Sequence, residues 1–325
     1  MHSLETGESF RVASVQAAPK YLDIDATVEK VVALVGEAAG HGARLIGFPE
    51  SFVPGFPLWV FKTAPLGPAS RLFRRLYKNA VVANSAHVAA IGEAARSGNI
   101  YVSVSVTERD GGSLYLSQLW FDPSGRLIGK HRKLKPTAAE RYIWGDGDPS
   151  TLAVYDSPLG RLGGLQCWEN LIPVIVNSMA NLNEQIHVAA WPYAAFNDGG
   201  LYEPIKASRR KRLEGKDPED DCGLSPREII TRNYALATQT FVVMPTTVMT
   251  QSTIDVLVEE VPSLAADIKL GGGASRIIAP DGASIGNHIP DTLEGIVYGD
   301  IAPDELIYAK YMCDPGGHYR IKGLS

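Results

Sequence analysis

The chain has 325 residues, of which 45% are hydrophobic and 21% are charged, and its formal net charge is −5. This composition is typical of a globular protein, and the length is enough for one large domain or two ordinary ones. The negative charge argues against nucleic acid as a main partner, because phosphate binding needs a basic face. The apolar runs are shorter than the ~18 residues of a membrane-spanning helix, which argues against a membrane protein.

Cysteine usage indicates a reducing compartment. The three cysteines, Cys167, Cys222 and Cys313, are few, odd in number and far apart, so we do not expect a disulfide framework. The first ten residues include Glu5 and Glu8 and lack the basic and apolar segments of a signal peptide. We therefore expect a cytoplasmic protein with free thiols.

The first half of the chain alternates short β-branched runs with longer amphipathic stretches. In chain order, the pattern predicts a strand over 10–17, a helix over 26–39, a strand over 43–48, and helical structure with one or two interruptions over 69–97. Three strands without intervening helices follow at 100–107, 114–121 and 126–130. A turn at 122–125 joins the last two of these strands.

The second half continues this alternation. It predicts a strand over 161–166, a helix over 171–182, a strand over 186–191, a helix over 226–240 and a strand over 241–245. The C-terminal part is rich in strands, at 274–279, 284–287 and 295–300. Strands interleaved with helices, together with adjacent strand pairs, predict mixed sheets covered by helices, in the α/β or α+β class.

One segment interrupts the pattern. Residues 206–225 carry a basic cluster that is followed at once by acidic residues, so the charges nearly cancel. Such a mixed run is typical of a solvated surface loop, and a basic patch for an anionic partner is the alternative. Since no shift in composition marks a linker, we interpret residues 1–325 as a single domain with a surface insertion at 206–225.

Three chemically different side chains follow predicted strands in the same way. Glu50, Lys133 and Cys167 each come shortly after such a strand. In open α/β architectures, functional sites form in the crevice beyond the carboxyl ends of the strands. We therefore expect a carboxylate, an ammonium group and a thiol to meet there, although each of these residues alone is more commonly part of the surface or the core.

Cys167 is the candidate nucleophile. It lies where an apolar stretch ends and a helical stretch begins. The N-terminus of a helix offers unpaired N–H groups and the positive end of the helix dipole, which favour the thiolate over the thiol. The alternative interpretation is a buried cysteine that acts as a small hydrophobic side chain.

Three sequence blocks contain these residues. They are Phe-Pro-Glu-Ser-Phe-Val-Pro-Gly-Phe-Pro at 48–57, His-Arg-Lys-Leu-Lys-Pro-Thr with Glu-Arg shortly after it at 131–141, and Cys-Trp-Glu-Asn at 167–170. In order and spacing, the blocks resemble the signature of the nitrilase branch of the carbon–nitrogen hydrolases, and the resemblance extends from about residue 10 to residue 319. The Trp-Glu pair after the cysteine resembles true nitrilases and their cyanide-hydrolysing relatives, since the amidase branches typically carry other residues there.

This resemblance implies an α-β-β-α sandwich and a catalytic triad of Glu50, Lys133 and Cys167. Glu140 matches a second glutamate that the family places beside the lysine, where it would orient the ammonium group or move protons. The chemistry agrees, because a nitrile carbon is a poor electrophile that needs a strong nucleophile such as a thiolate. Glu50 would accept the thiol proton and later activate water. Lys133, with backbone N–H groups near Trp168, would stabilise the negative charge on nitrogen.

Aromatic side chains near predicted strand ends are candidates for an apolar substrate pocket, and core packing is the alternative for each of them. They are Trp168, Trp191, Phe52 and Tyr193. We expect no metal or organic cofactor, because the seven histidines show no paired ligand spacing. A lone histidine such as His187 or His318 is more commonly structural.

The sequence therefore predicts a cofactor-free nitrilase that converts an organic nitrile and water to a carboxylic acid and ammonia through a thioimidate and a thioester on Cys167. The rivals are cyanide or nitrile hydration that stops at the amide, an amidase of the same fold, and a catalytically silent binding scaffold. The expected partners are a small nitrile and further copies of this chain, in a homodimer or higher oligomer. The sequence ends six residues after Tyr319, before the tail that nitrilases usually carry, so we do not expect long filaments.

Overall fold

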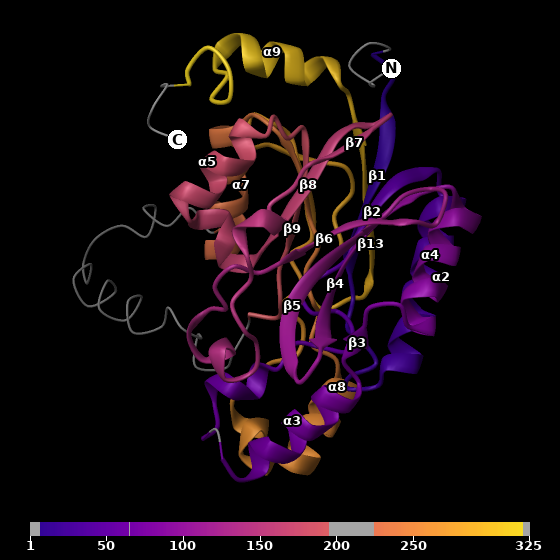
Figure 1. Cartoon of the computed structure of the whole chain (residues 1–325), viewed down its shortest axis with the longest axis vertical. Coiled ribbons are helices and arrows are strands. Elements are labelled where there is room, and N and C mark those ends of the chain that lie inside the picture. The colour runs from indigo at the N-terminus through magenta and orange to yellow at the C-terminus, as the bar shows by residue number, and fades with distance from the viewer. Residues whose placement is uncertain (1–6, 65, 195–223, 321–325) are drawn as a thin grey trace, which may run out of the picture.

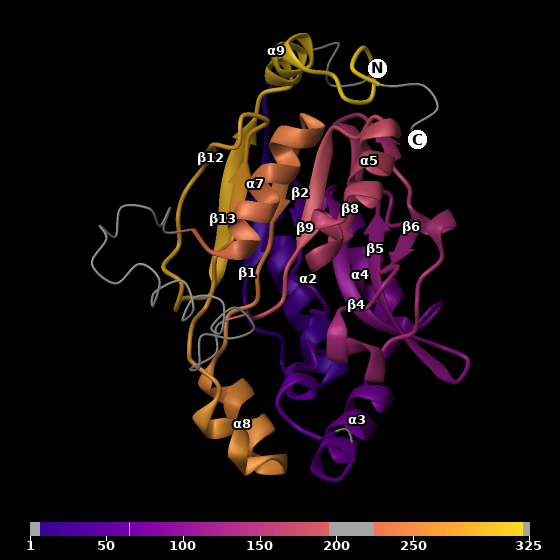
Figure 2. The same cartoon turned by 90° about the vertical axis from the view of Figure 1, so that its left-hand side faces the viewer.

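The computed structural model describes residues 7–64, 66–194 and 224–320. These residues form two β-sheets packed face to face, with helices on both outer faces, as two perpendicular views show (Figures 1 and 2). This is the α-β-β-α sandwich that the sequence resemblance implies. Most of the predicted insertion, residues 206–223, lies outside the described residues.

The first sheet has the strand order β13-β1-β2-β4-β5-β6, and β3 pairs with β4. Its strands are β1 (Phe10–Gln16), β2 (Ala43–Gly47), β3 (Val81–Val82), β4 (Tyr101–Asp110), β5 (Ser113–Phe121), β6 (Leu127–Arg132) and β13 (Gly295–Ile301). Strands β1, β2 and β4 run parallel, and β4, β5 and β6 form an antiparallel meander. Because β6 therefore runs in the same direction as β2, the residues that follow these two strands lie at the same edge of the sheet.

The second sheet has the strand order β12-β11-β10-β9-β8-β7. Its strands are β7 (Tyr155–Ser157), β8 (Gly160–Gln166), β9 (Ile186–Ala190), β10 (Phe241–Met244), β11 (Arg276–Ile278) and β12 (Ser284–Ile285). Strands β8, β9 and β10 run parallel, and β7 and β11 flank them in the antiparallel direction. Cys167 follows β8 directly and so lies at the carboxyl edge of the three parallel strands.

The space between the sheets is filled by apolar side chains from both, as expected for strands that are covered on two faces. Leu45 and Trp120 of the first sheet share a buried cluster with Val188 of the second. The sheets approach closely at β8, where a Cβ on Gly164 would lie only 2.6 Å from Nε2 of Gln118 in β5. Glycine is required at this position, and its small size holds β8 close to the first sheet.

The outer helices are α2 (Ile24–Gly40) and α4 (Ala86–Gly98) on the first sheet, and α5 (Pro173–Asn181) and α7 (Pro226–Thr238) on the second. Each pair buries an apolar face against its own sheet. Side chains cap the helix starts that matter here: Asp23 accepts a hydrogen bond at the start of α2, and Ser225 and Glu228 form a capping box at the start of α7.

Further helices lie at the two ends of the sandwich. α3 (Pro68–Lys78) and α8 (Gln251–Glu260) pack together at the lower end of Figure 1, and α9 (Asp304–Met312) lies at the upper end. Short 3₁₀ turns are formed by Leu58–Phe61, Ala138–Tyr142, Pro149–Thr151, Cys167–Leu171 and Pro262–Ala266. In the part of the chain that the structure describes, no helix combines the length and the hydropathy that crossing a bilayer requires.

The predicted strands are confirmed to within a few residues at each end, and 69–97 folds as α3 and α4 with β3 between them. The helix predicted over 171–182 begins only at Pro173, because the residues before it form a 3₁₀ turn. The sequence pattern does not predict β7, α8 or α9. β7 is only three residues long. In α8 the β-branched Ile254, Val256 and Val258 disfavour a helix, so packing against α3 decides the conformation. Helix α9 buries only Leu306 and therefore has no apolar pattern to predict it.

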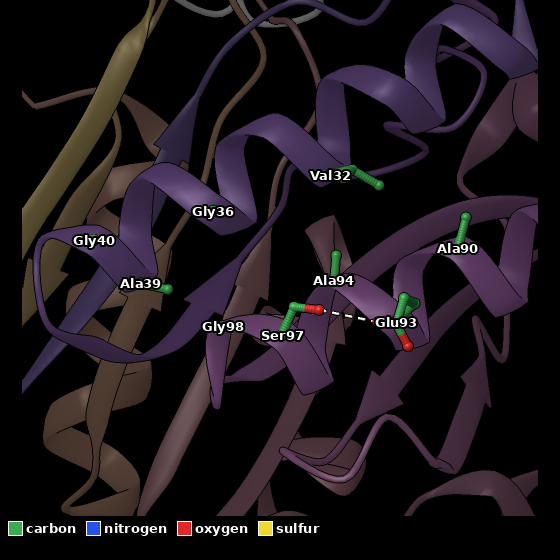
Figure 3. A pocket seen from close by; sticks show the side chains of 9 residues that line it. All are labelled: Val32, Gly36, Ala39, Gly40, Ala90, Glu93, Ala94, Ser97 and Gly98. Atoms are coloured by element: carbon green, nitrogen blue, oxygen red, sulfur yellow. Dashed lines mark hydrogen bonds between the residues drawn. The ribbon is translucent and has the colours of Figure 1, made fainter.

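A groove of about 650 Å³ lies between α2 and α4 on the outer surface of the first sheet (Figure 3). Its lining residues, mostly small, are Val32, Gly36, Ala39, Gly40, Ala90, Glu93, Ala94, Ser97 and Gly98. Cys167 belongs instead to the core beneath α5 and α7, on the second sheet. The groove is therefore separate from the candidate active site.

Candidate active site

Glu50, Lys133 and Glu140 meet in one buried cluster. The Nζ atom of Lys133 lies 2.8 Å from Oε1 of Glu50 and 2.8 Å from Oε2 of Glu140, and all three side chains are at most 2% exposed. Glu50 lies in one sequence block and Lys133 and Glu140 in another, and the ends of β2 and β6 in the first sheet bring them together. Two carboxylates thus share one ammonium group in a site that excludes bulk water.

The strands fix the first two members of this cluster. Glu50 follows β2, and its backbone N–H donates at 3.3 Å to the carbonyl of Trp191, the residue directly after β9 of the second sheet. Lys133 comes directly after β6, and its backbone N–H donates to the carbonyl of Leu116 in β5 at 2.8 Å. The backbone of each residue is therefore held by a neighbouring strand, which leaves little freedom to the side chain.

Glu140 is held by a capping interaction in a short turn rather than by a strand. It belongs to the 3₁₀ turn Ala138–Tyr142, where Thr137 and Glu140 form a capping box. The backbone N–H of Thr137 donates to Oε2 of Glu140 at 2.7 Å, and the same oxygen accepts from Lys133. One carboxylate oxygen thus caps the turn and holds the ammonium group.

Glu50 has one oxygen free for chemistry. Its Oε1 accepts from Lys133, but its buried Oε2 makes no hydrogen bond with the described residues. Burial raises the pKa of Glu50 to about 8, because the repulsion from Glu140 adds to burial while Lys133 opposes it. A carboxyl group that titrates in this range is suited to act as a general base near neutral pH.

Lys133 stays charged. Burial on its own lowers the pKa of the ammonium group, but the carboxylates of Glu140 and Glu50 outweigh burial and raise it well above its ordinary value. The ammonium group is thus a permanent positive charge at the site. Such a fixed charge stabilises negative charge that develops on a reacting atom nearby.

Cys167 sits at a sharp junction. It is 5% exposed, it begins the 3₁₀ turn Cys167–Leu171, and its φ of +50° lies in the left-handed region that side chains rarely adopt. The backbone N–H of Trp168 donates to the sulfur. A strained residue at the end of a buried strand is a common arrangement for a reactive side chain.

The thiol is protonated in the free protein. Burial and the carboxylate of Glu50 raise the pKa of Cys167 well above its ordinary value, and Lys133 opposes them only in part. The expectation that a helix dipole favours the thiolate is wrong, because a five-residue 3₁₀ turn follows Cys167 and α5 starts only at Pro173. Loss of the thiol proton must therefore be coupled to a base, and Glu50 is the nearby group that can take it.

Glu169 stabilises the turn after Cys167. Its buried carboxylate lies 3.1 Å from Nε2 of His131 and accepts from the backbone N–H groups of Gln166 at 3.1 Å and Leu134 at 2.8 Å. Burial raises the pKa of Glu169, but His131, the backbone N–H of Leu134 and the charge of Lys133 together outweigh burial and lower the net pKa. The carboxylate thus joins the Cys167 turn to the segment that carries the catalytic lysine.

A second buried network holds the backbone of Cys167. The carbonyl of Cys167 accepts from Nδ2 of Asn170 at 2.8 Å, and Oδ1 of Asn170 lies 2.7 Å from Nε2 of His187. Nδ1 of His187 lies 2.8 Å from Oε1 of Glu184, whose other oxygen accepts from the hydroxyl of Tyr234 at 2.5 Å. Because Oδ1 of Asn170 only accepts, Nε2 of His187 carries a proton. His187 is therefore structural, as we expect from the sequence.

The predicted aromatic residues are only partly brought together. Trp191 shares a buried cluster with Cys167, and Trp168 packs against that cluster. Tyr193 packs in the neighbouring cluster near α8, where its hydroxyl donates to the carbonyl of Lys269 at 2.5 Å. Phe52 does not belong with them.

The ring of Phe52 is fully buried in the core beneath α2 and α4, with its centroid 5.4 Å from that of Phe48. The prediction of a pocket role for Phe52 therefore needs correction. The chain turns at Ser51, whose φ is +46°, so Phe52 packs in the core while Glu50 contacts Lys133.

Sequence reasoning missed the partners of the Cys-Trp-Glu-Asn block. Glu169 and Asn170 lie in that block, so their positions carried a signal. Their partners come from elsewhere: His131 from β6, Glu184 from the loop before β9 and Tyr234 from α7. Their pairing depends on tertiary structure and has no local pattern. Within residues 7–64, 66–194 and 224–320, no group of three or more histidine, cysteine or acidic side chains is arranged to hold a metal ion.

Comparison with known proteins relates this site to a family. Residues 11–311 match the family model described as carbon-nitrogen hydrolase. The chain is 44% identical to a nitrilase of Bacillus sp. (strain OxB-1), over 97% of this chain and 86% of that one. It is 39% identical to an aliphatic nitrilase of Rhodococcus rhodochrous, over 97% of this chain and 81% of the relative.

Among solved structures, the chain resembles an amidase from Nesterenkonia sp. with a TM-score of 0.63, covering 92% of both chains. The two sequences are 16% identical, so this likeness shows a shared fold alone.

Proposed function

This chain belongs to the carbon–nitrogen hydrolase family, and we propose that it is a nitrilase, which hydrolyses an organic nitrile to a carboxylic acid and ammonia. Its similarity to nitrilases along nearly the whole chain supports this reaction. The structural observation that carries the proposal is the buried Glu50–Lys133–Glu140 cluster, which acts electrostatically on the Cys167 thiol.

In the first half of the reaction, Cys167 attacks the nitrile carbon. The thiol proton moves to the free oxygen of Glu50 as the sulfur–carbon bond forms. Negative charge develops on the nitrile nitrogen, where the ammonium group of Lys133 stabilises it. Glu50 then returns the proton to nitrogen, which gives a neutral thioimidate. Glu140 acts through Lys133, because it holds the ammonium group at the reacting atom.

In the second half, two water molecules complete the reaction. Glu50 takes a proton from the first water as its oxygen bonds to the thioimidate carbon. The carbon–nitrogen bond breaks, nitrogen leaves as ammonia, and a thioester remains on Cys167. The second water attacks this thioester in the same way, and the acid leaves as the thiol regains its proton. The thiol and the two waters supply every atom and proton, so the scheme uses no metal or organic cofactor.

The acid product depends on which bond of the tetrahedral intermediate breaks. If the carbon–sulfur bond breaks before nitrogen is protonated, the product is the amide. Lys133 and Glu140 control this choice in our scheme, because they set how readily the nitrogen is protonated. Trp191 and Trp168, which pack with Cys167, are the residues we propose to contact the apolar part of the nitrile.

We also propose that the chain forms a homo-oligomer and works in the cytoplasm. Exposed apolar side chains gather on and around α5 and α7; they are Leu171, Ile172, Val174, Ile229 and Leu236. An exposed apolar face of this kind is typical of contacts between copies of a chain. A reducing compartment suits a reaction that needs Cys167 as a free thiol.

The test is product analysis on a panel of nitriles. Cyanide and small aliphatic, arylaceto- and aromatic nitriles are incubated with the protein, organic products are identified by mass spectrometry, and ammonia is quantified. We expect carboxylic acid with an equal amount of ammonia. Amide without ammonia would show a hydratase, and turnover of amides alone would show an amidase.

The role of Cys167 is tested in the same assay. We expect Cys167→Ala to lose turnover completely, because no other described group replaces the thiol. Cys313→Ala is the matched control, since Cys313 is a free cysteine directly after α9 and lies outside the buried cluster that contains Cys167. It should keep the wild-type rate. Turnover by Cys167→Ala above the uncatalysed rate would contradict the assignment.

A further inference from the structure

Arg227 is a buried cation without an ionic partner. Its side chain belongs to a residue that is 9% exposed, and its Nη2 donates to the carbonyl of Gly272 at 2.6 Å. Its Nε and Nη1 make no hydrogen bond with any described residue, and no described carboxylate pairs with it. The neighbouring Glu228 is engaged elsewhere, since it accepts from Ser225 and lies 3.7 Å from Arg276.

The topology places Arg227 at the catalytic edge of the second sheet. Helix α7 connects β9 to the parallel β10, so the start of α7 lies at the carboxyl edge where Cys167 follows β8. Helix α7 also packs against the 3₁₀ turn that begins at Cys167. The carbonyl of Arg227 accepts from Thr231, and Thr231 in turn accepts from the indole N–H of Trp191 at 3.0 Å.

Electrostatics agree with this placement. Burial lowers the pKa of Arg227 to about 10, while Glu228, Cys167 and Tyr193 act in the opposite direction. The guanidinium group is therefore still charged at neutral pH. It is also near enough to the Cys167 sulfur for the two groups to influence each other.

A buried cation without a counter-charge favours the binding of an anionic ligand. Three N–H groups on Nε and Nη1 remain for a ligand, and the planar guanidinium fork matches the two oxygens of a carboxylate, as it also matches a phosphate. A carboxylate on a substrate would be repelled by the acidic cluster around Lys133. A cation near the thiol offsets this repulsion.

We propose that Arg227 binds a carboxylate at the far end of the substrate, and that the natural substrates are nitriles that carry such a group. This inference rests on the proposed nitrilase function and adds the substrate class to it. Arg227 is in this view a specificity-determining residue, which selects cyano-carboxylates over neutral nitriles of the same size.

The experiment compares charged and neutral nitriles of the same shape. The probes are ω-cyano-carboxylates with one to four methylene groups and the methyl ester of each. We measure kcat/KM for the wild type, Arg227→Met and Arg232→Met. For the chain length that spans the distance from Cys167 to Arg227, the wild type should prefer the acid over the ester by roughly 10- to 100-fold, mainly through KM. Arg227→Met should abolish this preference.

Arg232→Met is the matched control. Arg232 lies on the same helix, but its guanidinium donates to Ser284 at 2.8 Å, away from Cys167. It should keep the acid-to-ester ratio of the wild type. Arg227→Lys, which keeps the charge but loses the planar fork, should give an intermediate ratio. If Arg227→Met does not fold, inhibition of the wild type by succinate and glutarate, against their dimethyl esters, measures the same carboxylate preference.

The outcomes separate this inference from the proposed function. Esters that are hydrolysed as well as acids at every chain length would overturn the inference and leave the nitrilase intact. Equal losses on acids and esters in Arg227→Met would also overturn it, because the cation would then support the thiol in general. Failure to hydrolyse any nitrile, charged or neutral, would overturn the nitrilase proposal itself.

Discussion

Lys133 and Arg227 are two buried cations with opposite surroundings. The ammonium group of Lys133 lies 2.8 Å from each of two carboxylates. The guanidinium group of Arg227 meets only the carbonyl of Gly272 and keeps two nitrogens without a partner among the described residues. Lys133 follows β6 of the first sheet and Arg227 lies at the start of α7 on the second, and each interacts electrostatically with Cys167.

The difference shows how a folded chain prepares for a reaction. A buried charge is costly unless it is paired, so a pair that is complete in the free protein is ready before substrate arrives. A buried charge without a pair destabilises the free protein, because its desolvation is not compensated until a ligand supplies the opposite charge. Lys133 therefore acts in the reaction of every substrate, whereas Arg227 determines which substrates bind.

The largest expected effect comes from breaking the complete pair. Lys133→Met removes the charge at nearly constant volume, and we expect kcat to fall by about 10²- to 10³-fold. It also leaves Glu50 and Glu140 facing each other, so the free energy of unfolding should drop by roughly 3–5 kcal/mol. Steady-state kinetics and urea denaturation measure the two effects. Lys135→Met, which removes an exposed lysine nearby, is the control. A similar loss in that variant would contradict a specific role for the charge of Lys133.

The next effect tests the base in this cluster. Since the pKa of Glu50 is raised to about 8, Glu50 is protonated below that pH and cannot accept the thiol proton. We expect kcat/KM to fall about tenfold for each pH unit below 8 and to level off above it while the thiol keeps its proton. A pH profile from 5.5 to 9 on a neutral nitrile measures this. A flat profile across that range would contradict the role of Glu50.

The third prediction is a change in the free energy of unfolding with the opposite sign to that of Lys133→Met. Arg227→Met, the same kind of substitution, removes a buried charge that has no partner, so we expect the free energy of unfolding to rise by roughly 1–3 kcal/mol. Thermal denaturation of Arg227→Met and Lys133→Met side by side gives the comparison. If both variants lose stability to the same degree, the contrast between the two cations is wrong.

The smallest effect comes from Glu108, a carboxylate whose cationic partners Lys130 and Arg132 are partly exposed. Burial raises the pKa of Glu108, but hydrogen bonds from Arg132, Lys130 and Ser117 outweigh burial and lower it to about 2. A carboxylate with a lowered pKa stabilises the fold above its unfolded pKa of about 4.5 and loses this effect as the pH falls toward 2. Glu108→Gln should therefore cost about 1 kcal/mol at pH 7.

This cost should vanish near pH 2. Urea denaturation at several pH values measures it, and Asp300→Asn, which removes only an exposed ion pair with Arg11, is the control. A cost for Glu108→Gln that stays constant from pH 7 to pH 2 would rule out this explanation.

The strand pattern and three local blocks predict much of this molecule. Alternating apolar runs identify the strands, and the order of strand ends already places Glu50, Lys133 and Cys167 at one edge. The state of the thiol is not predictable in this way, because it depends on burial and on the distance to Glu50. Arg227 carries no local signal either, since only the packing of α7 against the Cys167 turn shows that its partner is missing.

The capping box at Thr137 makes the backbone a reporter of the active site. Its amide proton is bound to the same oxygen of Glu140 that holds Lys133. Any event that changes the charge on this oxygen, such as a proton transfer during turnover, acts directly on that amide. The nuclear magnetic resonance signal of the Thr137 amide therefore follows the ionisation of the cluster without a label at any reacting atom.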